Sequence, residues 1–271
     1  MTQIIAMANQ KGGVGKTTTS VNLAASLGAA EKKVLLIDMD PQANATSGIG
    51  LTENVAEQKT IYEVLLGEQN INDCILQAKT PFVWTLPATS DLAGFEVEAV
   101  DLQDREFLLH KAIQNLNTVF DYILIDCPPS LSLITINALV AAKDVLVPLQ
   151  AEYYALEGLS RLTETIELVQ ENLNPRLNIK GIVLTMFDKR NNLCHQVETE
   201  INTHFPNLVW QTKIPRNVRL SEAPSFGQPI IQYDITSVGS QSYLDLAAEC
   251  IKKYETLSAT KQPNKTTNAQ A

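Results

Sequence analysis

The chain has few cysteines, no long apolar run and no basic excess, and each absence excludes a class of protein. Its four cysteines lie far apart among 271 residues, with no CxxC spacing, which argues against a disulfide framework or a zinc site. No apolar run exceeds five residues, so no segment is expected to span a bilayer. The N-terminal MTQIIA lacks the basic and apolar regions of a secretory signal. We therefore expect a cytoplasmic protein.

The charge of the chain is acidic but unevenly distributed. The formal net charge is −9. Residues 1–185 hold 12 basic and 22 acidic residues, whereas residues 186–271 hold 9 basic and 8 acidic ones. Such a chain is not expected to bind nucleic acid over its whole surface. A local basic face would have to come from the second segment.

Short apolar runs alternate with stretches of helical periodicity, which is typical of a parallel sheet covered on both faces. Strands are expected at 3–8, 33–38, 82–86, 121–126, 144–149 and 179–186. Helices are expected at 17–30, 60–67, 105–117, 132–142, 157–172, 194–204 and 237–254. We predict a single α/β domain over residues 1–255, with a mostly parallel, twisted sheet. Residues 256–271 are polar and are expected to form a disordered tail.

The segment KGGVGKTT at 11–18 lies between the first expected strand and the first expected helix, which is the context of a phosphate-binding loop. Glycines let backbone N–H groups turn toward phosphate oxygens, and the following helix adds free donors. The ordinary pattern GxxxxGK[ST] does not match, because its first glycine would fall on Gln10. Instead an additional lysine stands at the start of the loop. The residues expected to contact nucleotide are Lys11, Gly12, Gly13, Val14, Gly15, Lys16, Thr17 and Thr18.

Carboxylates follow two of the apolar strands. Asp38 and Asp40 end the run VLLIDMD, and we expect both to face the loop, where one orients water and one serves a metal. Asp126 ends YILID, and a carboxylate in that position typically holds Mg²⁺ through water in P-loop NTPases. The hydroxyl of Thr17 is the expected direct Mg²⁺ ligand.

These segments resemble the deviant Walker-A ATPases and, within them, the ParA/Soj partition family. The resemblance rests on KGGVGKTT (11–18), DMDPQANAT (38–46) and ILIDCPPS (123–130). It extends to EYYALEGL (152–159) and IPRNVRLSEAPSFGQPI (214–230), and so covers about residues 1–255. The resemblance implies a P-loop NTPase fold and slow, partner-stimulated hydrolysis of ATP with Mg²⁺.

The resemblance also implies roles for individual residues. Lys11 would reach the phosphates of the partner subunit in a homodimer that sandwiches ATP. Asp40 would position the attacking water and belong to the metal shell with Asp126. Pro215 and Asn217 would lie near the adenine base. Arg190 and Arg219 would lie on a DNA-binding face, and their neighbours Lys189 and Arg216 are added to that face.

The function implied is non-specific DNA binding on the nucleoid and chromosome or plasmid partitioning with a ParB-type protein. The alternative is an ATP-timed protein-binding switch that positions other cargo or controls replication. The sequence shows no acceptor-site signature of a metabolic kinase or ligase. Cys127 lacks the partner cysteines that an iron–sulfur site needs. The C-terminal segment has no apolar stripe of an amphipathic helix, so binding to a membrane is not expected. Asn191 and Cys194 depart from the family pattern, and the chain starts too close to the first strand for an operator-binding extension.

Overall fold

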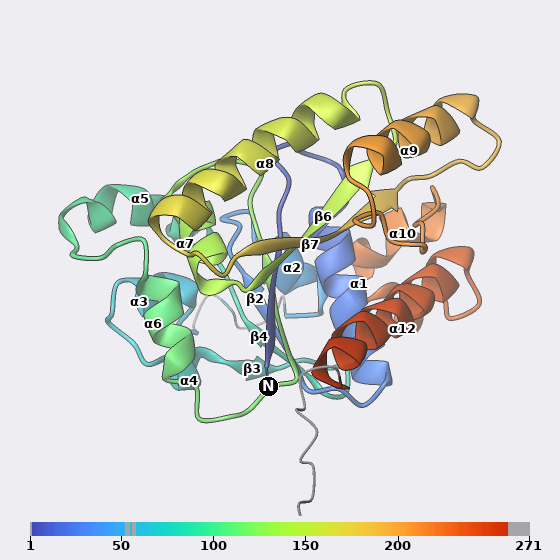
Figure 1. The fold of residues 1–271 in the computed structure, drawn as a ribbon. Coiled ribbons are helices and arrows are strands. Elements are labelled where there is room, and N and C mark those ends of the chain that lie inside the picture. The colour runs from blue at the N-terminus through green and yellow to red at the C-terminus, as the bar shows by residue number, and fades with distance from the viewer. Residues whose placement is uncertain (1, 52–54, 56–57, 260–271) are drawn as a thin grey trace, which may run out of the picture.

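Seven strands form one twisted sheet in the order β3-β4-β2-β5-β1-β6-β7 in a computed structural model of the chain (Figure 1). All neighbouring strands are parallel except β3, which runs antiparallel to β4. The structure describes residues 2–51, 55 and 58–259, and side chains up to residue 255. The strands are β1 (Gln3–Met7), β2 (Val34–Asp38), β3 (Leu76–Gln77), β4 (Val83–Leu86), β5 (Tyr122–Asp126), β6 (Asp144–Gln150) and β7 (Asn178–Thr185).

The central strands are apolar on both faces because helices cover both. Every residue of β2 and β5 is buried, as expected for parallel strands between two helical layers. Successive side chains alternate between the faces. Leu35 and Ile37 pack into one apolar cluster, whereas Val34 and Leu36 pack into the other.

One face of the sheet carries the first and last long helices, which pack against each other (Figure 1). This layer consists of α1 (Lys16–Ala29), α2 (Asn44–Gly48), α10 (Val218–Glu222), α11 (Ile230–Tyr233) and α12 (Val238–Ala259). The other face carries α3 (Ile61–Leu65), α4 (Ile71–Cys74), α5 (Phe95–Glu98), α6 (Leu108–Gln114), α7 (Leu133–Ala141), α8 (Ala155–Asn172) and α9 (Asn192–His204). Short 3₁₀ helices lie at Ser90–Gly94, Ala99–Asp101 and Ala223–Phe226.

The predicted fold class is confirmed, and the differences concern short elements and helix ends. Helix α6 is shorter than the expected 105–117, and the two-residue strand β3 was not expected. Thr60 and Glu63 form a capping box at the start of α3, which lies within the expected helix 60–67. Helix α12 continues through Ala259, so it includes the first four residues of the expected tail. Residues 260–271 of that tail lie outside the described residues. No described helix is long and apolar enough to cross a bilayer.

Candidate nucleotide-binding site

The loop between β1 and α1 lies at the carboxyl edge of the sheet, where ligands bind in open α/β folds. Two of its glycines adopt left-handed backbone conformations, with φ of 74° at Gly13 and 85° at Gly15. Such angles disfavour residues that carry a Cβ atom. Gly15 is the N-cap of α1, so the free N–H groups of that helix face the loop. This geometry suits a bound phosphate.

Two side chains attach the loop to neighbouring strands. The amide of Asn9 donates to the carbonyl of Pro148 in β6 at 2.8 Å, and its oxygen accepts from the backbone N–H of Lys11 at 3.0 Å. The hydroxyl of Thr185, at the end of β7, donates to the carbonyl of Val14 at 2.8 Å. Sequence reasoning missed both residues, although each is a polar residue at the end of an apolar strand. Their hydrogen bonds attach the loop to the ends of β6 and β7.

The side chain of Lys16 is folded into the loop rather than into solvent. Only 7% of the residue is exposed, and its Nζ donates to the carbonyl of Lys11 at 3.0 Å. Burial lowers the pKa of the ammonium, while the nearby carboxylates of Asp126 and Asp40 oppose that shift. Lys16 is thus a partly desolvated cation inside the curve of the loop, as contact with phosphate requires.

Asp126 lies fully buried beside the start of α1. The hydroxyl of Ser20 lies 2.6 Å from its Oδ1, whereas Oδ2 has no hydrogen-bond partner among the described residues. Burial and then the charge of Asp38 raise the pKa of Asp126, whereas the hydroxyls of Ser20 and of nearby Thr17 lower it. A buried, unpartnered carboxylate oxygen close to a threonine hydroxyl fits Mg²⁺, which takes few protein ligands and completes its shell with water and phosphate. Among the described residues, no group of three or more Asp, Glu, His or Cys side chains could hold a metal ion.

Asp38 does not face the loop, contrary to our expectation for both carboxylates of DMD. Its carboxylate accepts hydrogen bonds from the backbone N–H and hydroxyl of Thr46, at 2.8 and 2.7 Å, and from the backbone N–H of Asp40 at 3.1 Å. These bonds stabilise the turn that follows β2. Asp40 follows as a mostly buried carboxylate that accepts from the N–H of Gln42 at 2.9 Å. Of the two, only Asp40 is placed to act near Lys16.

Lys11 forms an ion pair with Glu152 of the same chain. Glu152 lies in the turn between β6 and α8, next to the loop in space and 141 positions away in sequence. Both side chains remain partly exposed, at 47% and 29%. Lys11 is therefore the loop lysine that can turn outward, whereas Lys16 cannot.

A cavity of about 330 Å³ opens between the start of α1 and the segment after residue 213. Thr18 lines it on one side and Pro215 and Asn217 line it on the other, so the structure brings these predicted site residues together. Tyr243 of α12 also lines the cavity, and its hydroxyl lies 3.2 Å from that of Thr19. The volume is in the range of small-molecule pockets, and it adjoins the phosphate loop through Gly15.

Comparison with known proteins identifies the family. A family model described as an AAA domain matches residues 2–179. The chain is 55% identical to the chromosome partitioning protein ParA of Myxococcus xanthus, over 93% of this chain and 88% of that protein. It is 53% identical to the sporulation initiation inhibitor protein Soj of Bacillus subtilis, over 92% and 98% of the two chains. The chain belongs to the ParA/Soj family of chromosome-partitioning ATPases. Among solved structures, it matches cobyrinic acid a,c-diamide synthase from Mycobacterium smegmatis with bound ATP analog and magnesium, with 33% identity, a TM-score of 0.82 and coverage of 94% and 97%.

The four basic residues expected on a DNA-binding face of this ParA/Soj chain come from two adjacent segments. Phe187 pairs with Pro215 in an isolated parallel bridge, so the segment with Lys189 and Arg190 lies beside the segment with Arg216 and Arg219. Two of these cations already have carboxylate partners. Arg190 pairs with Asp188 at 3.2 Å, and Arg219 pairs with Glu222 at 2.9 Å and with Asp234 at 3.5 Å.

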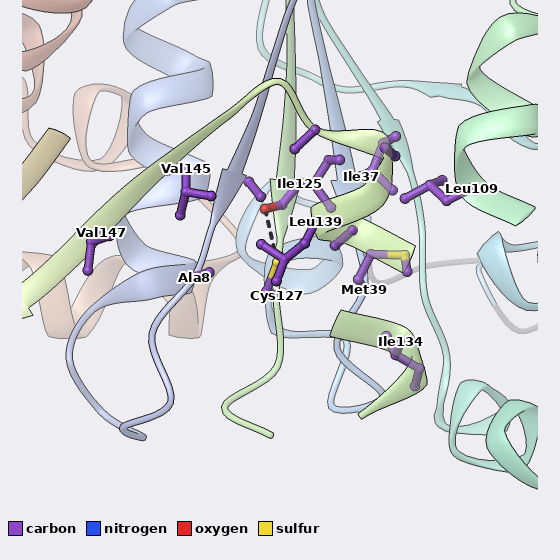
Figure 2. Packing of buried hydrophobic residues seen from close by; sticks show 14 of the residues in the cluster. Ala8, Ile37, Met39, Leu109, Ile125, Cys127, Ile134, Leu139, Val145 and Val147 are labelled. Carbon is purple, nitrogen blue, oxygen red and sulfur yellow. Dashed lines mark hydrogen bonds between the residues drawn. The ribbon is translucent and has the colours of Figure 1, made fainter. Parts of the chain in front are cut away.

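Three further residues singled out in the sequence, Asn191, Cys194 and Cys127, have clear structural places. Asn191 caps α9, where its side chain accepts from the backbone N–H of Leu193 at 2.9 Å. Cys194 is buried, with its sulfur 3.6 Å from the carbonyl of Ala151. Cys127 lies in the apolar cluster with Ile134 and Leu139 and contacts the carbonyl of Ile125 (Figure 2). Both cysteines are core thiols that support the loops around the site.

Proposed function

We propose that this family member hydrolyses ATP with Mg²⁺ and uses the cycle to control a homodimer that binds DNA. The observation that carries the proposal is the continuity of the phosphate loop with the cavity at Pro215 and Asn217. A nucleotide placed along this path has its phosphates at Gly12–Thr18 and its base at the far end of the cavity. Lys16 would contact the terminal phosphates, and Thr18 the inner ones.

Residues of this chain would hold the metal and the attacking water. Thr17 would bind Mg²⁺ directly, Asp126 would hold it through water, and Asp40 would complete this shell. Bound Mg²⁺ neutralises phosphate charge during transfer. Asp40 also accepts a hydrogen bond from the water whose oxygen attacks the γ-phosphorus, while the bond from that phosphorus to the β–γ bridging oxygen breaks. The proton of the attacking water leaves with the phosphate product or passes through Asp40 to solvent.

Lys11 would supply a cation to the phosphates of the second subunit. Its side chain is held by one partly exposed ion pair, so it can leave Glu152 at a cost of about 1 kcal/mol or less. A cation supplied in trans makes hydrolysis depend on dimer formation, as an arginine finger does. Binding of ATP would therefore close the dimer, and hydrolysis would open it.

Membership of the family and the two adjacent basic segments support the proposal that the protein binds DNA. Membership of the family also supports a role for a partner protein. Lys189, Arg190, Arg216 and Arg219 would contact phosphates without reading sequence, and two copies in a dimer would double the number of contacts. A ParB-type protein would stimulate hydrolysis and so release the dimer from DNA. The protein would then be cytoplasmic and associated with the nucleoid.

The ion pairs of Arg190 and Arg219 favour a second candidate, a switch whose ATP-bound dimer binds protein cargo instead of DNA. DNA phosphates must compete with Asp188, Glu222 and Asp234 for these guanidinium groups. Two measurements distinguish the candidates: ATPase rate, and retention on DNA against salt with ATP, ADP or no nucleotide. Partitioning predicts ATP-dependent, salt-sensitive retention that Arg190→Ala with Arg219→Ala abolishes. Unchanged retention in that variant would favour the cargo switch, and equal ATPase rates for Lys16→Ala and the wild type would contradict the enzymatic proposal.

A further inference from the structure

Arg219 lies between two carboxylates on the face proposed to bind DNA. Its Nη1 donates to Oε2 of Glu222 at 2.9 Å, and its Nε lies 3.5 Å from Oδ2 of Asp234. Glu222 belongs to α10, whereas Asp234 directly follows α11, so the two carboxylates come from different segments. The Arg219 side chain is still 54% exposed. A DNA phosphate can therefore reach it, but only in competition with both carboxylates.

Neighbouring groups hold both carboxylates in place. The hydroxyl of Tyr233 donates to Oε2 of Glu222 at 3.1 Å, and its ring stacks on that of Phe226 with 5.1 Å between centroids. Oδ1 of Asp234 accepts from the backbone N–H and the hydroxyl of Thr236, at 3.1 and 2.8 Å. That arrangement leaves Oδ2 for the guanidinium. Charges fixed in a network of this kind interact more effectively than an isolated pair on the surface.

Carboxylates cancel most of the charge of the proposed DNA-binding face. A third one, Asp188, pairs with Arg190 at 3.2 Å. The four cations of this face and the three carboxylates paired with two of them leave one positive charge per subunit. Affinity for DNA depends on how many phosphates a protein neutralises. A single subunit is therefore expected to bind DNA weakly.

We propose that Glu222 and Asp234 are affinity-limiting residues, which hold Arg219 so that one subunit alone is not retained on DNA. The inference rests on the proposed function, because that function assigns Arg219 to DNA. In the ATP-bound dimer, two such faces bind one duplex, and the free energies of separate contacts add. After hydrolysis, a separated subunit has only one face, and its carboxylates compete successfully with phosphate. The carboxylates thus make DNA binding depend on the dimer.

The network can be changed without touching the nucleotide cavity, although both use α10. Leu220 and Ser221 line the cavity, whereas Arg219, Glu222 and Asp234 do not. Replacing the two carboxylates with amides removes their charge but keeps their shape and an acceptor oxygen for the neighbouring hydroxyls. Such substitutions therefore test the affinity for DNA separately from the binding of ATP.

The test compares the DNA affinity of the full-length wild type with that of Glu222→Gln combined with Asp234→Asn. The probe is a DNA duplex of mixed sequence, titrated at several salt concentrations with ATP and with ADP. The matched control is Glu164→Gln with Glu167→Gln, which removes two exposed charges from α8 on the other face of the sheet. This control changes the net charge by the same amount as the paired variant does.

The paired variant should bind DNA more tightly in both nucleotide states. With ADP, we expect roughly fivefold tighter binding than for the wild type, the ratio that corresponds to one exposed ion pair. With ATP, both subunits of the dimer gain, so we expect roughly 25-fold tighter binding. The control should stay within about twofold of the wild type, because salt screens charges that are far from the DNA.

Two further measurements assign the gain to Arg219. The slope of log affinity against log salt should steepen by about 0.9 per subunit, because the freed guanidinium neutralises one more phosphate. In an Arg219→Ala background, the two amide substitutions should leave the affinity for DNA unchanged. A gain that persists without Arg219 would show that the carboxylates repel DNA directly, and it would overturn the assignment.

The remaining outcomes separate this inference from the proposed function. Equal affinity of the paired variant and the wild type would overturn the inference and leave the proposed function standing. Weaker binding by the variant would mean that the carboxylates orient Arg219 toward phosphate, which also overturns it. A wild-type protein that binds no DNA with ATP would overturn the DNA-binding part of the proposed function itself.

The single substitutions keep the inference testable if the paired variant folds poorly. Glu222→Gln and Asp234→Asn should each tighten DNA binding with ADP, by less than the pair does, because each leaves one carboxylate beside the guanidinium. Thermal unfolding of each variant shows whether it is folded. The absence of any gain in both folded single variants would overturn the inference.

Discussion

Lys11 and Glu152 form an ion pair within one chain, between the phosphate loop and the turn that follows β6. In the proposed mechanism, the same ammonium acts on the phosphates of another subunit. The two positions exclude each other, so Glu152 competes with the nucleotide for Lys11. The strength of this one exposed pair therefore bears on the resting rate of the ATPase.

Glu152→Gln should raise the basal ATPase rate by up to about fivefold. A partly exposed ion pair is worth up to about 1 kcal/mol, and a barrier lowered by that amount changes a rate by about that factor. The measurement is kcat at saturating ATP without partner or DNA. Glu255→Gln is the matched control, because it breaks the exposed Lys32–Glu255 pair on the other helical layer. A lower rate in Glu152→Gln would indicate that Glu152 orders Lys11 for catalysis instead of restraining it.

Stability without nucleotide should fall as pH rises from about 4 toward neutrality. Asp38 and Asp126 are paired neighbours in β2 and β5. Burial is the main cause that raises the pKa of each carboxyl above its ordinary value of 3.8. A carboxyl whose pKa is raised by folding stabilises the fold below its unfolded pKa, and this contribution is lost as pH rises through the folded pKa. Thermal unfolding between pH 4 and 8 measures the effect.

Asp126→Asn removes one of these ionisations and should raise the stability of the nucleotide-free protein at pH 7.5. We expect at least about 1 kcal/mol, or roughly 2–4 °C in Tm for a domain of this size. The same variant should lose the further rise in Tm that the wild type gains with ATP and Mg²⁺. Asp245→Asn, at an exposed position of α12, is the control and should change neither quantity. A lower Tm for Asp126→Asn at pH 7.5 would contradict the prediction.

Gly13→Ala should destabilise the protein, whereas Gly12→Ala should not. A Cβ atom meets nothing within 4 Å at either position, so space does not distinguish them. The backbone does, because only Gly13 has a positive φ, which costs a residue with Cβ roughly 1–2 kcal/mol. Denaturant unfolding of the two variants without nucleotide measures this difference. Equal stabilities would mean that the loop rearranges without cost.

Thr185→Val should weaken the attachment of the phosphate loop. The substitution keeps the shape of the side chain but removes the hydroxyl that donates to the carbonyl of Val14. Leaving a buried acceptor without a donor costs about 1–3 kcal/mol. We expect lower stability and at least severalfold weaker nucleotide binding, measured by titration calorimetry. Thr185→Ser keeps the hydroxyl and should bind nucleotide nearly as the wild type does. Wild-type affinity in Thr185→Val would show that β7 does not support the loop.

The sequence predicted those parts of the protein whose structure is indicated by the residues of one short segment alone. The loop 11–18 combines glycines, a lysine and threonines between a strand and a helix, so its place could be read without a structure. The strands β2 and β5 are continuous apolar runs, and the structure confirms both. The elements missed were the short helices α2, α4, α5, α10 and α11 and the edge strand β3, because each is short and held by packing against distant residues.

The partners of the site residues could not be predicted in the same way. Asp38 and Asp40 look equivalent in the run DMD, but Thr46, eight residues after Asp38, takes up the carboxylate of Asp38. Lys11 and Glu152 form an ion pair, but neither of the two sequence segments in which they lie indicates that they are in contact. The exposure of Tyr153 and Tyr154, two adjacent aromatic residues, also could not be predicted from their segment. Contacts of this kind depend on how the loops fold over the edge of the sheet.

Because Tyr243 forms part of the wall of the nucleotide cavity, the site is completed late during synthesis of the chain. The phosphate loop is among the first segments to leave the ribosome, but the cavity wall comes from residues 214–224 and from α12. At a synthesis rate of about 5–20 residues per second, roughly 10–50 s separate the two. A nascent chain thus carries its phosphate loop without a complete site for most of its synthesis. Ligand binding can stabilise the fold only after nearly the whole protein has been made.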